Sequence, residues 1–157
     1  MKMEKKGKKY FTNSARQTQE LGRDFAKKIK DNPLGKGAFV FGLSGDLGSG
    51  KTTFLQGFAE GLGVKEKILS PTFVIFKKFK INGKTVFKDF YHIDCYRLSS
   101  GKDLLELRFK DMISDPKNII AIEWPEIIEK ILPKKTGIIK FKFVGEKKRA
   151  VVLLETS

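Results

Sequence analysis

The 157-residue sequence contains a single cysteine, Cys95, and no long apolar stretch. One cysteine excludes an intramolecular disulfide, which fits the reducing cytosol. The longest apolar stretches have about six residues, whereas a helix that spans a bilayer needs roughly 20. The basic N-terminus lacks the apolar segment of a secretory signal. We therefore expect a cytoplasmic protein without a membrane span, in which residues 1–12 form a basic, flexible tail.

Acidic residues are few: 18 Asp and Glu stand against 32 Lys and Arg, which gives a net charge of +14. Such an excess favours polyanionic partners such as nucleic acid, acidic protein surfaces or anionic lipid. A lysine-rich proteome with solvated charged surfaces explains the same excess. Hydrophobic residues make up 40% of the chain, enough for a core, and the length predicts one domain over residues 1–157.

The spacing of apolar residues predicts alternating helices and strands in the first half of the chain and hairpins in the rest. The continuous apolar run at 38–43 is typical of a strand buried on both faces, in a sheet covered by helices. Asn82-Gly83, between two strand-like stretches, is a strong hairpin signal. Predicted helices cover 14–30, 51–62, 103–113 and 126–132, and predicted strands cover 38–43, 72–81, 84–93, 119–122, 138–144 and 149–154.

A glycine-rich segment, GDLGSGKTTF, follows the first buried strand and precedes a predicted helix. Gly45, Gly50, Lys51 and Thr52 in it satisfy the pattern G-x-x-x-x-G-K-[ST]. The glycines let consecutive backbone N–H groups form an anion nest, and the helix start adds its positive dipole end. In this pattern the lysine reaches the β- and γ-phosphates of a nucleotide and the threonine hydroxyl binds Mg²⁺. We therefore predict a P-loop NTPase-like α/β fold: a three-layer sandwich with a mixed, largely parallel sheet and added hairpins.

Two carboxylates at predicted strand ends are candidates for the acidic partner that Mg²⁺ needs. Asp94 follows the run at 90–93, and Glu123 follows the run at 119–122. Glu123 resembles the Walker B pattern more closely, because ligands in open α/β sheets lie at the carboxyl ends of the strands. For each carboxylate, a solvated strand-end acid without a function is the alternative. His92 lies on the same strand face as Asp94. Two roles are equally consistent with this position: a residue of the site, or a structural histidine held by a hydrogen bond.

The absence of two further sequence features limits the choice of nucleotide and of reaction. The chain has no Asn/Thr-Lys-x-Asp motif, which GTPases use to read guanine, so we expect ATP. Its arginines are scattered and do not form the arginine-rich lid of small-molecule kinases. A small-molecule kinase on the same fold and a nucleotide-dependent RNA-binding module remain the alternative functions.

Four motifs in order, GDLGSGKTTF, SPTF (70–73), HIDCYRL (92–98) and IEWPE (122–126), resemble the TsaE family, also called YjeE. The first motif is generic, whereas the other three in this order are specific to the family. The resemblance implies a single P-loop ATPase domain that binds ATP and Mg²⁺ and hydrolyses ATP slowly by itself. It also implies action with the TsaD and TsaB proteins, which attach a threonylcarbamoyl group to adenosine in tRNA, so that tRNA is met through the shared complex.

The same resemblance implies roles for individual residues. Thr72 would lie on a switch-like loop near the γ-phosphate. Asp94 would lie at the site, either as part of the shell of groups around the metal or as a carboxylate that orients water, and Trp124 would lie beside the site. The roles of Tyr96 and Arg97 stay open. The implied phosphate-binding residues are Leu47, Gly48, Ser49, Gly50, Lys51, Thr52 and Thr53; the implied Mg²⁺ ligands are Thr52 and Glu123; and the implied catalytic residues are Lys51, Asp94, Glu123 and Thr72.

Overall fold

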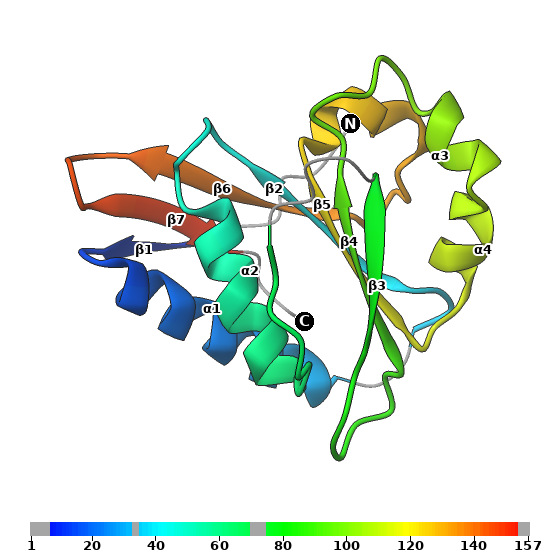
Figure 1. Cartoon of the computed structure of the whole chain (residues 1–157), viewed down its shortest axis with the longest axis horizontal. Coiled ribbons are helices and arrows are strands. Elements are labelled where there is room, and N and C mark those ends of the chain that lie inside the picture. The colour runs from blue at the N-terminus through cyan, green and yellow to red at the C-terminus, as the bar shows by residue number, and fades with distance from the viewer. Residues whose placement is uncertain (1–6, 33–34, 70–74, 154–157) are drawn as a thin grey trace.

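A mixed β-sheet forms the middle of the molecule (Figure 1). The computed structural model describes residues 7–32, 35–69 and 75–153. Within this part, seven strands are arranged in the order β1-β7-β6-β2-β5-β4-β3. The four central strands run parallel, and β1, β7 and β3 are antiparallel to their neighbours. The strands are β1 (Lys8–Thr12), β2 (Phe39–Ser44), β3 (Phe76–Lys80), β4 (Asp89–Asp94), β5 (Asn118–Glu123), β6 (Gly137–Phe143) and β7 (Arg149–Leu153).

Helices cover both faces of this sheet, which confirms the predicted three-layer α/β sandwich (Figure 1). Helices α1 (Ala15–Lys30) and α2 (Lys51–Leu62) cover one face; α3 (Lys102–Glu106), α4 (Phe109–Ser114) and the 3₁₀ helix η1 (Pro125–Ile131) cover the other. Alternate side chains of the central strands enter the two cores. Phe41 of β2 packs with α1 and α2, whereas Val40 packs with α4. A strand buried on both faces therefore reads as a continuous apolar run.

Helices α1 and α2 pack against each other at very short range because two glycines face the contact. A Cβ on Gly57 would lie 1.9 Å from the carbonyl oxygen of Gln19, and a Cβ on Gly22 would lie 2.1 Å from that of Phe54. Ser14 caps α1, since its side chain accepts a hydrogen bond from the backbone N–H of Gln17 at 3.1 Å. The glycines therefore allow the close approach of α1 and α2, and the cap sets where α1 begins.

The prediction of a flexible tail is wrong for residues 8–12, which form edge strand β1. This strand pairs with β7 from Lys8↔Leu153 to Thr12↔Arg149. The hydroxyls of Thr12 and Thr18, 2.7 Å apart and buried, tie it to α1. Lysines made the segment look solvated, but its backbone pairs with the open edge of β7 and Tyr10 packs against the core. Residues 1–6 of the predicted tail lie outside the described residues.

Two other local predictions need correction. Strands β3 and β4 do pair, but Lys80 lies opposite Asp89, so the connection spans 81–88 instead of the two residues Asn82-Gly83. The backbone N–H of Asn82 instead donates to the carbonyl oxygen of Gly63 at the end of α2, so Asn82 takes part in a long-range contact. The predicted helix at 103–113 is broken between α3 and α4 at Arg108, which has a φ of 62°.

Among the residues that the structure describes, none of the helices is long and apolar enough to cross a membrane.

Candidate functional site

The glycine-rich loop at 45–50 joins the end of β2 to the start of α2. A Cβ on Gly45 would lie 2.6 Å from the carbonyl oxygen of Phe141, so no side chain fits there. Gly50 precedes α2 with a φ of 106° and offers no side-chain cap. The first N–H groups of a helix have no partners within it, so those of α2 are available to a ligand. The loop is therefore built to accept an anion at the positive end of the helix dipole.

The Lys51 side chain is buried at the centre of this loop. Its Nζ donates a hydrogen bond to the carbonyl oxygen of Gly45 at 2.6 Å and lies 3.8 Å from the centre of the Trp124 ring. Burial lowers the pKa of Lys51, while the carboxylates of Glu123 and Asp94 act in the opposite direction. The loop thus holds an ammonium group next to its backbone N–H groups, ready to contact phosphate oxygens.

Two carboxylates face the loop from the neighbouring strands. Strands β4 and β5 pair in parallel with Asp94 directly beside Glu123, and Glu123 is also level with Leu43, one residue before the end of β2. Glu123 is 4% exposed, and its Oε2 lies 2.7 Å from Nε2 of His92. The predicted Walker B carboxylate therefore lies at the carboxyl end of the strand next to the loop.

Asp94 has a different environment from Glu123. Its Oδ1 accepts a hydrogen bond from the backbone N–H of Tyr96 at 3.0 Å. Burial raises the pKa of Asp94 above its usual range, the nearby Glu123 carboxylate raises it further, and the Tyr96 N–H acts against both. A carboxylate with a raised pKa is a better proton acceptor, which suits a residue that orients or activates water.

These groups line one cleft of about 930 Å³. Predicted residues found on its wall are Leu47, Gly48, Gly50, Lys51, Thr52, Thr53, Asp94, Glu123 and Trp124. Ser49, within the loop, is buried and does not line the cleft, and its Oγ has no hydrogen-bond partner. Thr72 lies outside the described residues, so its predicted role stays a prediction.

Two parts of the wall were not predicted from the sequence. The start of α1 contributes Ser14, Ala15 and Thr18, and the β6–β7 connection with the first residue of β7 contributes Glu146, Lys147 and Arg149. The Arg149 guanidinium lies 4.1 Å from the centre of the Phe143 ring and donates to the carbonyl oxygen of Glu146 at 3.2 Å. No local motif marks these residues; only the position of α1 and the last hairpin beside the loop brings them to the cleft.

The donor set fits a nucleotide with Mg²⁺. Free N–H groups and the ammonium of Lys51 suit phosphate oxygens, while the hydroxyl of Thr52 and the carboxylate of Glu123 are oxygen ligands of the kind that Mg²⁺ takes. Among the described residues, no group of three or more His, Cys, Asp and Glu side chains is arranged so that it could hold a metal ion by itself. Mg²⁺ does not require one, because it usually binds one or two carboxylates together with water and phosphate oxygens.

The sheet order, the loop between β2 and α2 and the carboxylates at the adjacent strand ends define the class: the chain is a P-loop protein with a three-layer α/β fold. It belongs to the TsaE family, because the model of the family described as "Threonylcarbamoyl adenosine biosynthesis protein TsaE" matches residues 12–151. This family belongs to a tRNA modification pathway, the biosynthesis of threonylcarbamoyladenosine.

Individual relatives agree with this assignment. The chain is 44% identical over 115 residues to the tRNA threonylcarbamoyladenosine biosynthesis protein TsaE of Borreliella burgdorferi, which covers 72% of this chain and 77% of the relative. It is 32% identical over 146 residues to the protein of that name from Rickettsia felis, covering 92% and 78%. The crystal structure of YdiB from Bacillus subtilis superposes with a TM-score of 0.69 at 30% identity, covering 99% of this chain and 89% of that one.

Proposed function

We propose that this protein binds and slowly hydrolyses ATP with Mg²⁺, and that its ATP cycle supports threonylcarbamoyladenosine modification of tRNA by TsaD and TsaB. One observation carries the proposal: the lysine of a P-loop and two strand-end carboxylates line a single cleft, in a member of the TsaE family. The motifs SPTF, HIDCYRL and IEWPE support the choice of partners, through the family resemblance.

In this proposal, the loop holds the phosphates and Lys51 exchanges the Gly45 carbonyl for β- and γ-phosphate oxygens. Thr52 and Glu123 would hold Mg²⁺, which would neutralise charge on the phosphates. Asp94 orients the attacking water and accepts its proton, as its raised pKa favours. Trp124 and Tyr96, whose ring centres are 5.2 Å apart, cover the side of the cleft next to Lys51 and restrict access of other water.

The proposal also gives the nucleotide a regulatory role. Thr72 would contact the γ-phosphate as part of a switch loop, so that ATP and ADP forms present different surfaces to TsaD and TsaB. The protein would then act in the cytoplasm as an accessory ATPase, with tRNA bound through the shared complex.

Reconstitution tests this function directly. TsaD, TsaB, tRNA and the activated threonylcarbamoyl donor are combined with the wild-type chain, and modified adenosine is counted over many turnovers with ATP or a non-hydrolysable analogue. We expect multiple turnovers only with the chain and hydrolysable ATP, and an arrest with Lys51→Ala. Turnover that continues without the chain would refute the accessory role, and ATP consumption that requires a small acceptor, which becomes phosphorylated, would indicate a kinase instead.

A further inference from the structure

A buried hydrogen bond joins the strand-end carboxylate to a histidine behind it. His92 is 1% exposed and Glu123 is 4% exposed, and His92 Nε2 lies 2.7 Å from Glu123 Oε2. An ionised carboxylate can only accept hydrogen bonds, so the imidazole donates from Nε2. The contact joins β4 to β5, and of the two residues Glu123 lines the cleft while His92 does not.

Sheet register explains why Glu123 turns to His92 and not to its direct neighbour. Glu123 of β5 is level with Asp94 of β4. Two residues earlier in each strand, on the same face of the sheet, Ala121 is level with His92. Two carboxylates side by side repel each other, whereas the small Ala121 leaves room beside it for the imidazole. The contact occupies Oε2 of Glu123 and leaves its Oε1 free of any contact with His92.

We propose that His92 is a positioning residue: its Nε2 holds one carboxylate oxygen of Glu123 so that the other faces the Mg²⁺ position in the cleft. The inference rests on the proposed function, in which Glu123 binds Mg²⁺. Partners that hold a metal ligand from behind fix its orientation, and their loss costs about 10–100-fold in metal affinity or activity. His92 itself touches neither nucleotide nor metal in this arrangement.

Mg²⁺ titrations of ATP hydrolysis test the proposal with three variants. His92→Phe keeps the bulk and removes the donor, and we expect the Mg²⁺ concentration for half-maximal rate to rise about 10–100-fold. His92→Gln places an amide donor near the position of Nε2 and should recover most of this loss. Tyr91→Phe is the matched control, because Tyr91 lies on the same strand but faces the other layer. Nucleotide binding without Mg²⁺ should be unchanged in all three.

A double-mutant cycle shows whether His92 acts through Glu123. We expect His92→Phe to add nothing in a Glu123→Ala background, whereas additive losses would overturn the proposal. If folded His92→Phe keeps the wild-type Mg²⁺ dependence while Glu123→Ala is impaired, the positioning role of His92 is wrong, but the assignment of Glu123 as a Mg²⁺ ligand stands. If Glu123→Ala keeps the wild-type Mg²⁺ dependence, the assigned Mg²⁺ ligand is wrong and the positioning role fails with it. If His92→Phe does not fold, His92→Asn, whose shorter amide does not reach Glu123, takes its place with the same expectations.

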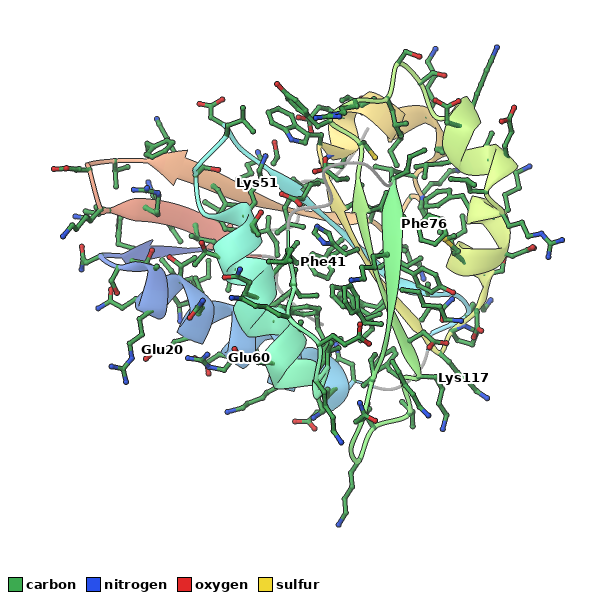
Figure 2. All side chains as sticks on the ribbon, in the orientation of Figure 1. Glu20, Phe41, Lys51, Glu60, Phe76 and Lys117 are labelled. Carbon is green, nitrogen blue, oxygen red and sulfur yellow. The ribbon has the colours of Figure 1, made fainter. Side chains whose placement is uncertain are left out.

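A second inference rests on a different observation, the lysines at the end of the molecule opposite the cleft. The last turn of α1 carries Lys27, Lys28 and Lys30. Exposed lysines also follow α2 at 65 and 67, occupy the β3–β4 connection at 84 and 88, and precede β5 at 117. Figure 2 shows Lys117 at the lower right of the molecule, whereas Lys51 lies at the upper end of α2. We call the surface formed by these lysines the basic end.

Two backbone hydrogen bonds and one from a lysine side chain hold the segments of the basic end together. Lys88 N–H donates to the carbonyl oxygen of Lys117 at 2.8 Å, Asn82 N–H donates to Gly63 at 3.3 Å, and Lys30 Nζ reaches Gly61 at 3.4 Å. The helix dipole accounts for lysines in the last turn of α1, because cations stabilise a helix C-terminus. It does not account for the exposed lysines that three other segments bring to the same end.

We propose that the basic end binds the phosphate backbone of RNA, independently of the nucleotide cleft. An ordered array of lysines drawn from several segments suits the repeated charges of a nucleic-acid backbone and requires no base recognition. The site would place RNA at one end of the molecule and ATP at the other.

Binding of labelled tRNA by fluorescence anisotropy, over a range of salt concentrations, tests this proposal. The combined variant Lys84→Glu, Lys88→Glu, Lys117→Glu should weaken binding about tenfold or more and flatten the salt dependence. Its matched control reverses Lys134, Lys135 and Lys140, which are exposed on and before β6. Both variants should keep wild-type ATP hydrolysis. Equal losses in the two variants, no binding at physiological salt, or tighter binding to anionic vesicles or an acidic peptide than to tRNA would each overturn the proposal.

Discussion

Replacing Lys51 with alanine removes the buried ammonium group that donates a hydrogen bond to Gly45 in the loop at 45–50 and lies against the Trp124 ring. A hydrogen bond that involves a charged group contributes about 1.5–3 kcal/mol. Lys51 would make two of them, to the β- and γ-phosphates, so about 3–6 kcal/mol is lost with its side chain. This corresponds to a fall of about 10²–10⁴-fold in the efficiency of ATP hydrolysis.

The fold should survive this change because two effects on stability oppose each other. The variant loses the 2.6 Å hydrogen bond to Gly45 and the contact of Nζ with the Trp124 ring. It also loses a buried ammonium group, whose pKa is lowered by that burial. We therefore expect the free energy of unfolding to stay within about 1–2 kcal/mol of the wild-type value.

The assay uses a feature of the sequence, since Trp124 is the single tryptophan and lies in the cleft. Its fluorescence reports nucleotide titrations, phosphate release reports hydrolysis, and thermal unfolding reports the fold. Lys130→Ala, at an exposed position in η1, is the control for loss of one positive charge. Hydrolysis within about threefold of wild type in a folded Lys51→Ala variant would refute the P-loop mechanism, because that loss is smaller than one charged hydrogen bond.

Three further predictions address the carboxylates and the helix contact. Glu123→Ala should reduce Mg²⁺-dependent hydrolysis more than ATP binding, and equal losses in a Mg²⁺ titration would contradict its role as a metal ligand. Asp94→Asn should slow hydrolysis but raise the melting temperature at pH 7 to 8. The raised pKa of Asp94 means that folding disfavours the ionised carboxylate. This cost to the stability of the wild type is complete above the pKa of the folded state and absent below the pKa of the unfolded state. The higher melting temperature of Asp94→Asn should therefore disappear at about pH 3. Gly57→Ala should destabilise the protein by about 1–3 kcal/mol or more, because its Cβ would lie 1.9 Å from the Gln19 oxygen, whereas Gly145→Ala should leave the melting temperature nearly unchanged.

Features that depend on neighbours in the chain could be predicted from the sequence. The apolar run of β2, the glycines and the start of α2 at Lys51 follow one another directly, so a single motif specifies the strand, the loop and the helix. The helix at 14–30 was also predicted, because the spacing of its apolar residues is a local signal. The runs at 90–93 and 119–122 placed Asp94 and Glu123 at strand ends for the same reason.

Which strand ends meet was decided by the tertiary structure alone. Asp94 and Glu123 are level only because β4 pairs in parallel with β5, and β5 reaches the loop only because it pairs with β2. Strand β1 escaped prediction because its partner is β7, at the other end of the chain. The contact of His92 with Glu123, and the wall formed by the start of α1 and the β6–β7 connection, have the same origin. The physical reason is that a short motif encodes backbone conformation, whereas sheet order is selected by the burial of both faces of the whole sheet at once.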